Sequence, residues 1–134
     1  MLQSVGGEHF YTTDASEAWT VFQNPGWVGE NAPGWLYHDQ VPGSVPLYRW
    51  HFPYSPYGAY FETIHTDEFS SLTQWGWILE RVEGYCFPTQ QPGTIPLYHA
   101  GNPISQDHLY TADFGEIGRL GYSFWRTECY VLPP

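Results

Sequence analysis

Histidines and acids that recur beside aromatic residues are the first candidates for chemistry in this chain. Residues 8–14 read Glu-His-Phe-Tyr-Thr-Thr-Asp, and residues 107–113 read Asp-His-Leu-Tyr-Thr-Ala-Asp. His9 and His108 therefore share a position, each preceded by an acid. Such an imidazole either bonds the backbone and fixes a turn or contacts a polar ligand. Metal binding needs several converging ligands, and the six histidines are scattered, so no metal site is predicted.

Two further acids each lie just after a Gly-Trp pair. Glu30 follows Gly26-Trp27, and Glu80 follows Gly76-Trp77. If these carboxylates are buried they need a partner, which Arg49 or Arg81 could supply in a structural ion pair. If they face solvent, they would accept hydrogen bonds from sugar hydroxyls. Both interpretations remain open at this point.

Aromatic residues make up 19% of the chain, more than the core of a small domain accommodates. Exposed Trp and Tyr are typical of stacking surfaces. Core packing is expected at the positions that recur along the chain, namely Trp27, Trp77 and Tyr122, and Trp35, Tyr85 and Tyr130. Better surface candidates are the tryptophans beside loops, Trp50, Trp75 and Trp125. The Pro-rich segment 50–58 is either a local mini-core or a binding lip, and we favour the lip.

An internal repeat contains these residues. Three separate hallmarks recur after 50 residues, from Phe10 to Tyr60, from Gly26 to Gly76 and from Pro46 to Pro96. A third copy follows with a helical stretch shorter by four residues. This alignment places Tyr11, Phe61 and Tyr110 at one position, which we expect in the core. A fixed period specifies the architecture before any local pattern does.

Each copy reads as four short strands and one short helix. Asp14 is a plausible N-cap for a helical turn ending near Phe22, and Asp113 occupies a similar place. Residues 24–26 read Asn-Pro-Gly and stop the first helix, and Trp27 and Trp35 begin a second pair of strands. We predict one domain, residues 1–134, with repeats at about 1–44, 45–93 and 94–134. Its fold is predicted to be mostly β with short helical turns, a closed β-trefoil-like structure or, alternatively, a three-unit propeller-like arrangement.

The hallmarks resemble a known repeat family. Pro46-Leu47-Tyr48-Arg49 and His9-Phe10-Tyr11-Thr12-Thr13 match the Pro-Leu-Tyr-Arg and Asp-His-Phe-Tyr-Thr-Thr signatures of secreted or surface microbial and fungal proteins. The resemblance covers nearly the whole chain and implies a repeated, lectin-like binding module without catalytic activity. The copies depart from it unequally, with Ala59 at the histidine position, His99 at the arginine position and Trp125 at the glutamate position.

Composition excludes several classes of protein. Lys and Arg number 4 against 14 Asp and Glu, a net charge of −10, which disfavours nucleic acid and anionic membrane surfaces as partners. No apolar run approaches the roughly 18 residues of a transmembrane helix. The first seven residues do not form a signal peptide, so either an intracellular protein or a mature secreted form is expected. Cys86 and Cys129 permit one disulfide, but we expect two buried free thiols.

The resulting prediction is a non-catalytic, carbohydrate-binding module with up to three pseudo-equivalent sites, glycans or glycoproteins as partners and no cofactor. Motifs of hydrolases, metalloproteases and nucleotide-binding enzymes are absent from the sequence. The alternatives are a protein-binding module such as a protease inhibitor, using segment 50–58, and a glycoside hydrolase with two carboxylates. The predicted ligand-binding residues are His9, Tyr11, Glu30, Trp35, Arg49, Trp50, Trp77, Glu80, Asp107, His108, Trp125 and Arg126.

Overall fold

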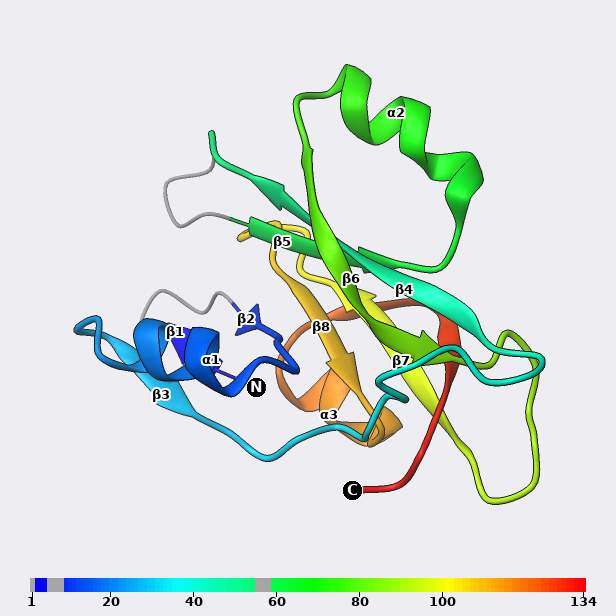
Figure 1. Cartoon of the computed structure of the whole chain (residues 1–134). Helices are drawn as coiled ribbons and strands as arrows, with labels where there is room; N and C mark the ends of the chain where they lie inside the picture. The colour runs from blue at the N-terminus through cyan, green and yellow to red at the C-terminus, as the bar shows by residue number, and fades with distance from the viewer. Residues whose placement is uncertain (1, 5–8, 55–58) are drawn as a thin grey trace.

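Short strands dominate the part of the chain that the computed structural model describes, residues 2–4, 9–54 and 59–134 (Figure 1). Four short helical segments accompany them, so the prediction of a mostly β fold with short helical turns is confirmed. The elements in chain order are β1 (Leu2–Ser4), β2 (His9–Phe10), α1 (Ala15–Phe22), β3 (Trp27–Gly29), β4 (Val45–Phe52), β5 (Ala59–Thr63), η1 (Thr66–Glu68), α2 (Phe69–Gln74), β6 (Ile78–Cys86), β7 (Ile95–Gly101), β8 (His108–Thr111), α3 (Phe114–Arg119) and β9 (Ser123–Val131).

The strands form three antiparallel sheets of three strands each. Their orders are β2-β1-β3, β5-β4-β6 and β8-β7-β9, so the first strand of each sheet lies in its middle. Figure 1 shows one short helix beside each sheet, with α1 next to the first, α2 next to the second and α3 next to the third. The three sheets are separate strand ladders, and the described strands do not close into the single barrel that a β-trefoil-like structure requires.

Helix boundaries follow the predicted capping residues. Asp14 accepts hydrogen bonds from the backbone N–H groups of Ser16 (2.8 Å) and Glu17 (3.1 Å), which satisfies two donors that the helix itself leaves free. Asp113 caps α3 in the same way, through the N–H of Gly115 at 3.0 Å. After α1, Gly26 adopts a φ of 94°, a left-handed conformation that favours glycine.

The predicted strand that begins at Trp35 is reduced to single bridges, whereas the matching segments of the other two copies are the ends of β6 and β9. Trp35 pairs with Leu132, Tyr37 with Tyr85, and Phe87 with Tyr130. The first bridge depends on a glycine, because a Cβ at Gly34 would lie 2.5 Å from Cγ2 of Val131 and 2.9 Å from the carbonyl oxygen of Leu132. Through these bridges the long connection from β3 to β4 is held against the second and third sheets.

The strand register corrects the prediction that Phe61 is the counterpart of Tyr110. On the central strands β4 and β7, Arg49 pairs with Glu62, and His99 pairs with Tyr110. Arg49 and His99 are themselves 50 residues apart, so Glu62, and not Phe61, occupies the place of Tyr110. The ungapped alignment missed this because a shift of one residue in a strand moves every side chain to the opposite face.

The core lies where the second and third sheets meet. It contains a disulfide between Cys86 of β6 and Cys129 of β9, so the expectation of two free thiols is wrong. The spacing of two cysteines carries no information on their distance in space, which only the packing of β6 against β9 supplies. The other buried members of this cluster are Leu47, Leu97, Tyr110 and Val131. Among the described residues, no helix is long and apolar enough to cross a membrane.

Candidate functional site

Two tyrosine hydroxyls tie the three sheets together at the centre of the molecule. The hydroxyl of Tyr11 accepts from the N–H of Tyr110 (2.8 Å) and donates to its carbonyl (3.2 Å). The hydroxyl of Tyr110 accepts from the N–H of Glu62 (2.5 Å) and donates to its carbonyl (2.6 Å). Burial raises the pKa of both phenols, so each keeps the proton that it donates.

Glu62 is the third residue linked by these hydrogen bonds, but it carries a carboxyl where Tyr11 and Tyr110 carry a phenol. Only 2% of the residue is exposed, and neither carboxyl oxygen has a hydrogen-bond partner among the described residues. Burial, reinforced by the negative charge of Glu83, raises the pKa of Glu62 well above its ordinary value. The group is therefore a neutral carboxylic acid that can both donate and accept a hydrogen bond.

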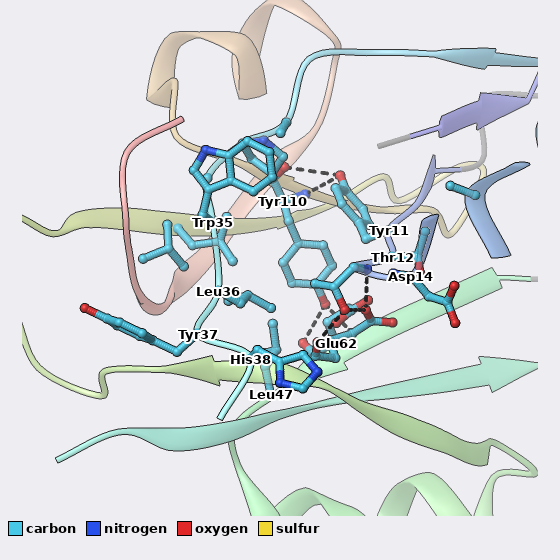
Figure 2. Close-up of a pocket in the computed structure, with 18 of the residues that line it drawn as sticks. Tyr11, Thr12, Asp14, Trp35, Leu36, Tyr37, His38, Leu47, Glu62 and Tyr110 are labelled. Carbon is cyan, nitrogen blue, oxygen red and sulfur yellow. Dashed lines mark hydrogen bonds between the residues drawn. The ribbon is translucent and has the colours of Figure 1, made fainter. Parts of the chain in front are cut away.

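Glu62 is one of the residues that line a pocket of about 390 Å³, named here the Trp35–Glu62 pocket, and each of its carboxyl oxygens exposes less than 1 Å². One wall is the segment 32–38, which carries Trp35, and the opposite side comes from α1 and the strands of the second and third sheets. Figure 2 shows Trp35 and Glu62 on either side of the Tyr110 ring. Trp35 is 59% exposed, so it is a surface aromatic at the pocket and not the core residue expected from its repeat position.

Arg49 holds a buried ion cluster next to this pocket. Its guanidinium binds Glu17 through two nitrogens (2.7 Å each), Glu80 (2.9 Å) and Glu83 (2.8 Å), and donates to the carbonyl of Tyr11 (3.2 Å). The hydrogen bonds from Arg49 lower the pKa of Glu17. The structural interpretation of Glu80 is thus confirmed, because it pairs with Arg49. With its donors engaged in this way, Arg49 positions the wall of the pocket through Glu83.

A matching cluster surrounds Arg126 in the third sheet. Arg126 binds Glu68 through two nitrogens at 2.8 and 2.9 Å and donates from Nε to Glu128 at 3.0 Å. Glu128 also accepts from the N–H of Ile64 at 3.2 Å, as Glu83 accepts from that of Thr13 at 3.1 Å. Both arginines predicted to bind ligand therefore act between strands and a neighbouring helical segment.

Three predicted residues from distant parts of the chain meet in another buried cluster. Asp107 accepts from the N–H of His9 at 2.8 Å, lies 2.5 Å from His9 Nδ1 and accepts from the hydroxyl of Tyr122 at 2.5 Å. Glu30 Oε2 lies 3.8 Å from His9 Nε2. His9 and Asp107 are almost completely buried, so this cluster fastens β2 to the start of β8. Glu8, the acid before His9, lies outside the described residues.

The remaining predicted residues divide between surface and core. Trp77, Asp107, His108 and Trp125 line a second pocket, described below. Trp50 is only 3% exposed and packs on Phe69, so the prediction of a surface role for it is wrong. Within segment 50–58, residues 55–58 lie outside the described part of the chain, and the binding-lip prediction extends onto them.

Sequence reasoning missed Glu62 and Glu83, two of the three acids that line the Trp35–Glu62 pocket. One signal was present. A one-residue gap between the first two copies would have aligned Glu62 with Tyr11 and Tyr110 and exposed it as the exception among three central residues. Hydrophobic pattern alone does not place such a gap, since Phe61 and Glu62 both lie in a strand of aromatic and polar residues.

Residues 1–132 match the model of one protein family, described as a domain of unknown function (DUF5648), and the chain belongs to that family. No curated protein and no solved structure matches the chain. The family description names no activity, so the geometry of the pocket has to carry the functional argument.

Proposed function

We propose that the protein is a carbohydrate-binding, lectin-like module and that its principal site is the Trp35–Glu62 pocket. The observation that carries this proposal is the buried, unpartnered carboxyl of Glu62 in a pocket with an exposed tryptophan at its edge. An unsatisfied buried carboxyl costs free energy unless a ligand completes its hydrogen bonds. Because the carboxyl oxygens are buried, the Glu62 side chain would turn toward the pocket to meet a sugar hydroxyl, which would act as both donor and acceptor.

The shape and lining of the pocket favour a sugar ring over other small ligands. Its volume of about 390 Å³ falls in the range of ligand sites, roughly 300–1,000 Å³. The exposed face of Trp35 suits the C–H face of a pyranose. Thr12 and Thr13 also line the pocket, and their hydroxyls, which donate to Glu17 and to the carbonyl of Glu83, can still accept a hydrogen bond. Much of the lining is apolar, with few polar groups to orient a ligand.

Charge excludes one class of ligand. Asp14 and Glu83 line the pocket beside the neutral Glu62, no Lys or Arg is among its described lining residues, and the chain carries a net charge of −10. A phosphate or a uronic acid would therefore be repelled. The proposed ligand is a neutral saccharide of one or two rings.

We also propose that the three sheets are three copies of one ancestral unit. The supporting observations are their common strand order and the matching clusters of Arg49 and Arg126. The resemblance to the Pro-Leu-Tyr-Arg repeat family agrees with this reading. Since only the second unit has a carboxyl in place of the central tyrosine, the three units would differ in ligand binding.

A glycan array on the whole chain, followed by calorimetry with the best ligand, tests the function. Glu62→Gln keeps the size of the side chain but exchanges the acid hydroxyl for an amide N–H, which is a weaker donor. We expect about tenfold weaker binding, a loss of about 1–1.5 kcal/mol. Trp35→Ala should abolish measurable binding. Trp75→Ala is the matched control, because Trp75 is 74% exposed and outside both pockets.

Two outcomes would contradict the proposal. One is the absence of sugar binding at millimolar concentration across the array. The other is binding that neither Glu62→Gln nor Trp35→Ala changes, which would place the sugar elsewhere on the protein.

A glycoside hydrolase is the second candidate, because two acids share one pocket and the pKa of Glu62 is raised, as a general acid requires. Prolonged incubation with the bound oligosaccharide separates the two functions. Release of shorter sugars by the wild type but not by Glu62→Gln would replace the lectin assignment. Recovery of intact ligand favours binding alone.

A further inference from the structure

A second pocket of about 390 Å³ lies on the third sheet and shares no residue with the first. Its aromatic lining comes from Phe52 of β4, Trp77 just before β6 and Trp125 of β9. His108, at the start of β8, forms part of the wall and is 8% exposed. It is named here the Trp77–Trp125 pocket.

His108 ends a chain of buried hydrogen bonds that begins at a carboxylate. Glu128 Oε1 lies 2.9 Å from His99 Nδ1, and His99 Nε2 lies 2.9 Å from His108 Nδ1. Glu128 also accepts from Arg126 at 3.0 Å, and its pKa is lowered, with His99 and Arg126 as the favourable partners. Glu128 is therefore ionised and can only accept.

The ionised Glu128 determines which atom donates and which accepts in each of these hydrogen bonds. Because Glu128 accepts, His99 must carry its proton on Nδ1, and burial lowers the pKa of His99 so that Nε2 stays bare. The bare Nε2 accepts from Nδ1–H of His108. Burial, with further lowering by His99 and Arg126, brings the pKa of His108 to about 3, so the ring is neutral and its Nε2 has no proton.

No other described residue hydrogen-bonds His108 Nε2, which leaves its lone pair available at the pocket wall. The second polar group is Asn102, whose Oδ1 accepts from the N–H groups of Ile104 (2.9 Å) and Ser105 (3.1 Å). With Oδ1 engaged, only its amide N–H groups remain for a ligand. The pocket thus offers the His108 acceptor, the Asn102 amide donor and aromatic walls, and Gln106 and Ser123 add further polar groups to its lining.

We propose that the Trp77–Trp125 pocket is a second saccharide site, in which His108 Nε2 accepts a hydrogen bond from a sugar hydroxyl while the ring packs on tryptophan. The proposal rests on the carbohydrate-binding function proposed above. An anionic ligand is disfavoured, because Asp107 lies in the wall and no Lys or Arg does. Two sites on one rigid chain would cross-link branched glycans and raise avidity on a multivalent surface.

Calorimetry with the sugar identified on the array, using the whole chain, tests the proposal by stoichiometry. The wild type should bind two sugars per chain. His108→Phe keeps an aromatic ring against Phe61 and Trp125 but removes the acceptor, and should bind one sugar in a Glu62-dependent way. Glu62→Gln should leave the other site at wild-type affinity. Trp75→Ala is the control, since Trp75 is 74% exposed and lies outside both pockets.

A wild type that binds one sugar, with unchanged affinity in His108→Phe and weakened binding in Glu62→Gln, would overturn the second site and leave the proposed function standing. Absence of any sugar binding would overturn both.

Nitrogen-15 NMR of the histidines tests the acceptor role of His108 on the wild-type protein, without any substitution. The free protein should show His108 protonated on Nδ1, opposite to the tautomer that free histidine prefers, and the Nε2 resonance should shift as sugar is added. A proton on Nε2 in the free protein would refute the acceptor role, and an Nε2 resonance unmoved by saturating sugar would refute the site.

Discussion

The substitution Glu62→Tyr would complete the central tyrosine set. In the strand register Glu62 occupies the position of Tyr110, whose hydroxyl clamps the N–H and C=O of Glu62 at 2.5 and 2.6 Å. Tyr11 clamps Tyr110 in the same manner. A phenol at position 62 should extend the series by reaching the backbone of Tyr11. Its ring should occupy the Trp35–Glu62 pocket.

The expected gain in stability can be estimated from three contributions. Removing an unpartnered buried carboxyl should gain about 1–3 kcal/mol, and two new hydrogen bonds about 1 kcal/mol each. Fitting the larger ring should cost about 1–3 kcal/mol. The net expectation is a rise of about 2 kcal/mol in the free energy of unfolding, which corresponds to roughly 5–10 °C in Tm for a chain of this size.

The gain should also depend on pH. In the wild type the pKa of Glu62 is raised above its ordinary 4.5 in the folded state, so the folded protein holds this proton more tightly than the unfolded chain does. That contribution is fully present below pH 4.5 and is lost as the pH rises through the folded pKa. The stability difference between Glu62→Tyr and wild type should therefore be larger at pH 8 than at pH 4.5.

Urea unfolding at these two pH values, with calorimetry of sugar binding, measures the predicted effects. Glu62→Gln is the matched control, because it removes the same titration without adding a ring. Two results for Glu62→Tyr would refute the prediction that a tyrosine at position 62 fills the pocket. One is lower stability than the wild type at pH 8, and the other is sugar binding of wild-type strength. If the stability of neither variant relative to the wild type changes between the two pH values, the prediction that Glu62 is a buried acid with a raised pKa is wrong.

Three further perturbations test other parts of the structure. Removing the Cys86–Cys129 disulfide, which spans 43 residues, should lower the free energy of unfolding by about 4 kcal/mol in the chain-entropy description, and thiol titration should find no free thiol before reduction. Arg49→Met should lower the free energy of unfolding by about 3–5 kcal/mol, because it leaves the buried carboxylate of Glu83 without its ion pair. Arg119→Ala removes an exposed pair and should leave urea unfolding unchanged. Equal effects of the two substitutions would contradict the role given to burial. Gly34→Ala should cost about 1–3 kcal/mol and weaken sugar binding by displacing Trp35, while Gly29→Ala, with no atom near the new Cβ, should bind as the wild type.

Local patterns in the sequence were sufficient for the elements themselves. Short strands, the capping role of Asp14 and Asp113, and the glycine after α1 follow from interactions within a few residues, and all of them are present. The Arg49–Glu80 pair was also predictable, because the two charges stood at recurring positions and a buried acid needs a partner.

The sequence by itself also determined which chemical groups are available: many aromatic residues, few cations and acids at recurring places. Tertiary structure alone decided how these groups meet. The strand register placed Glu62 at the centre, the packing of β6 on β9 joined Cys86 to Cys129, and the bridge at Trp35 built the wall of the pocket. Each depends on contacts between residues far apart in the chain, and a one-residue change of register, invisible in composition or period, reverses which side chains face the core.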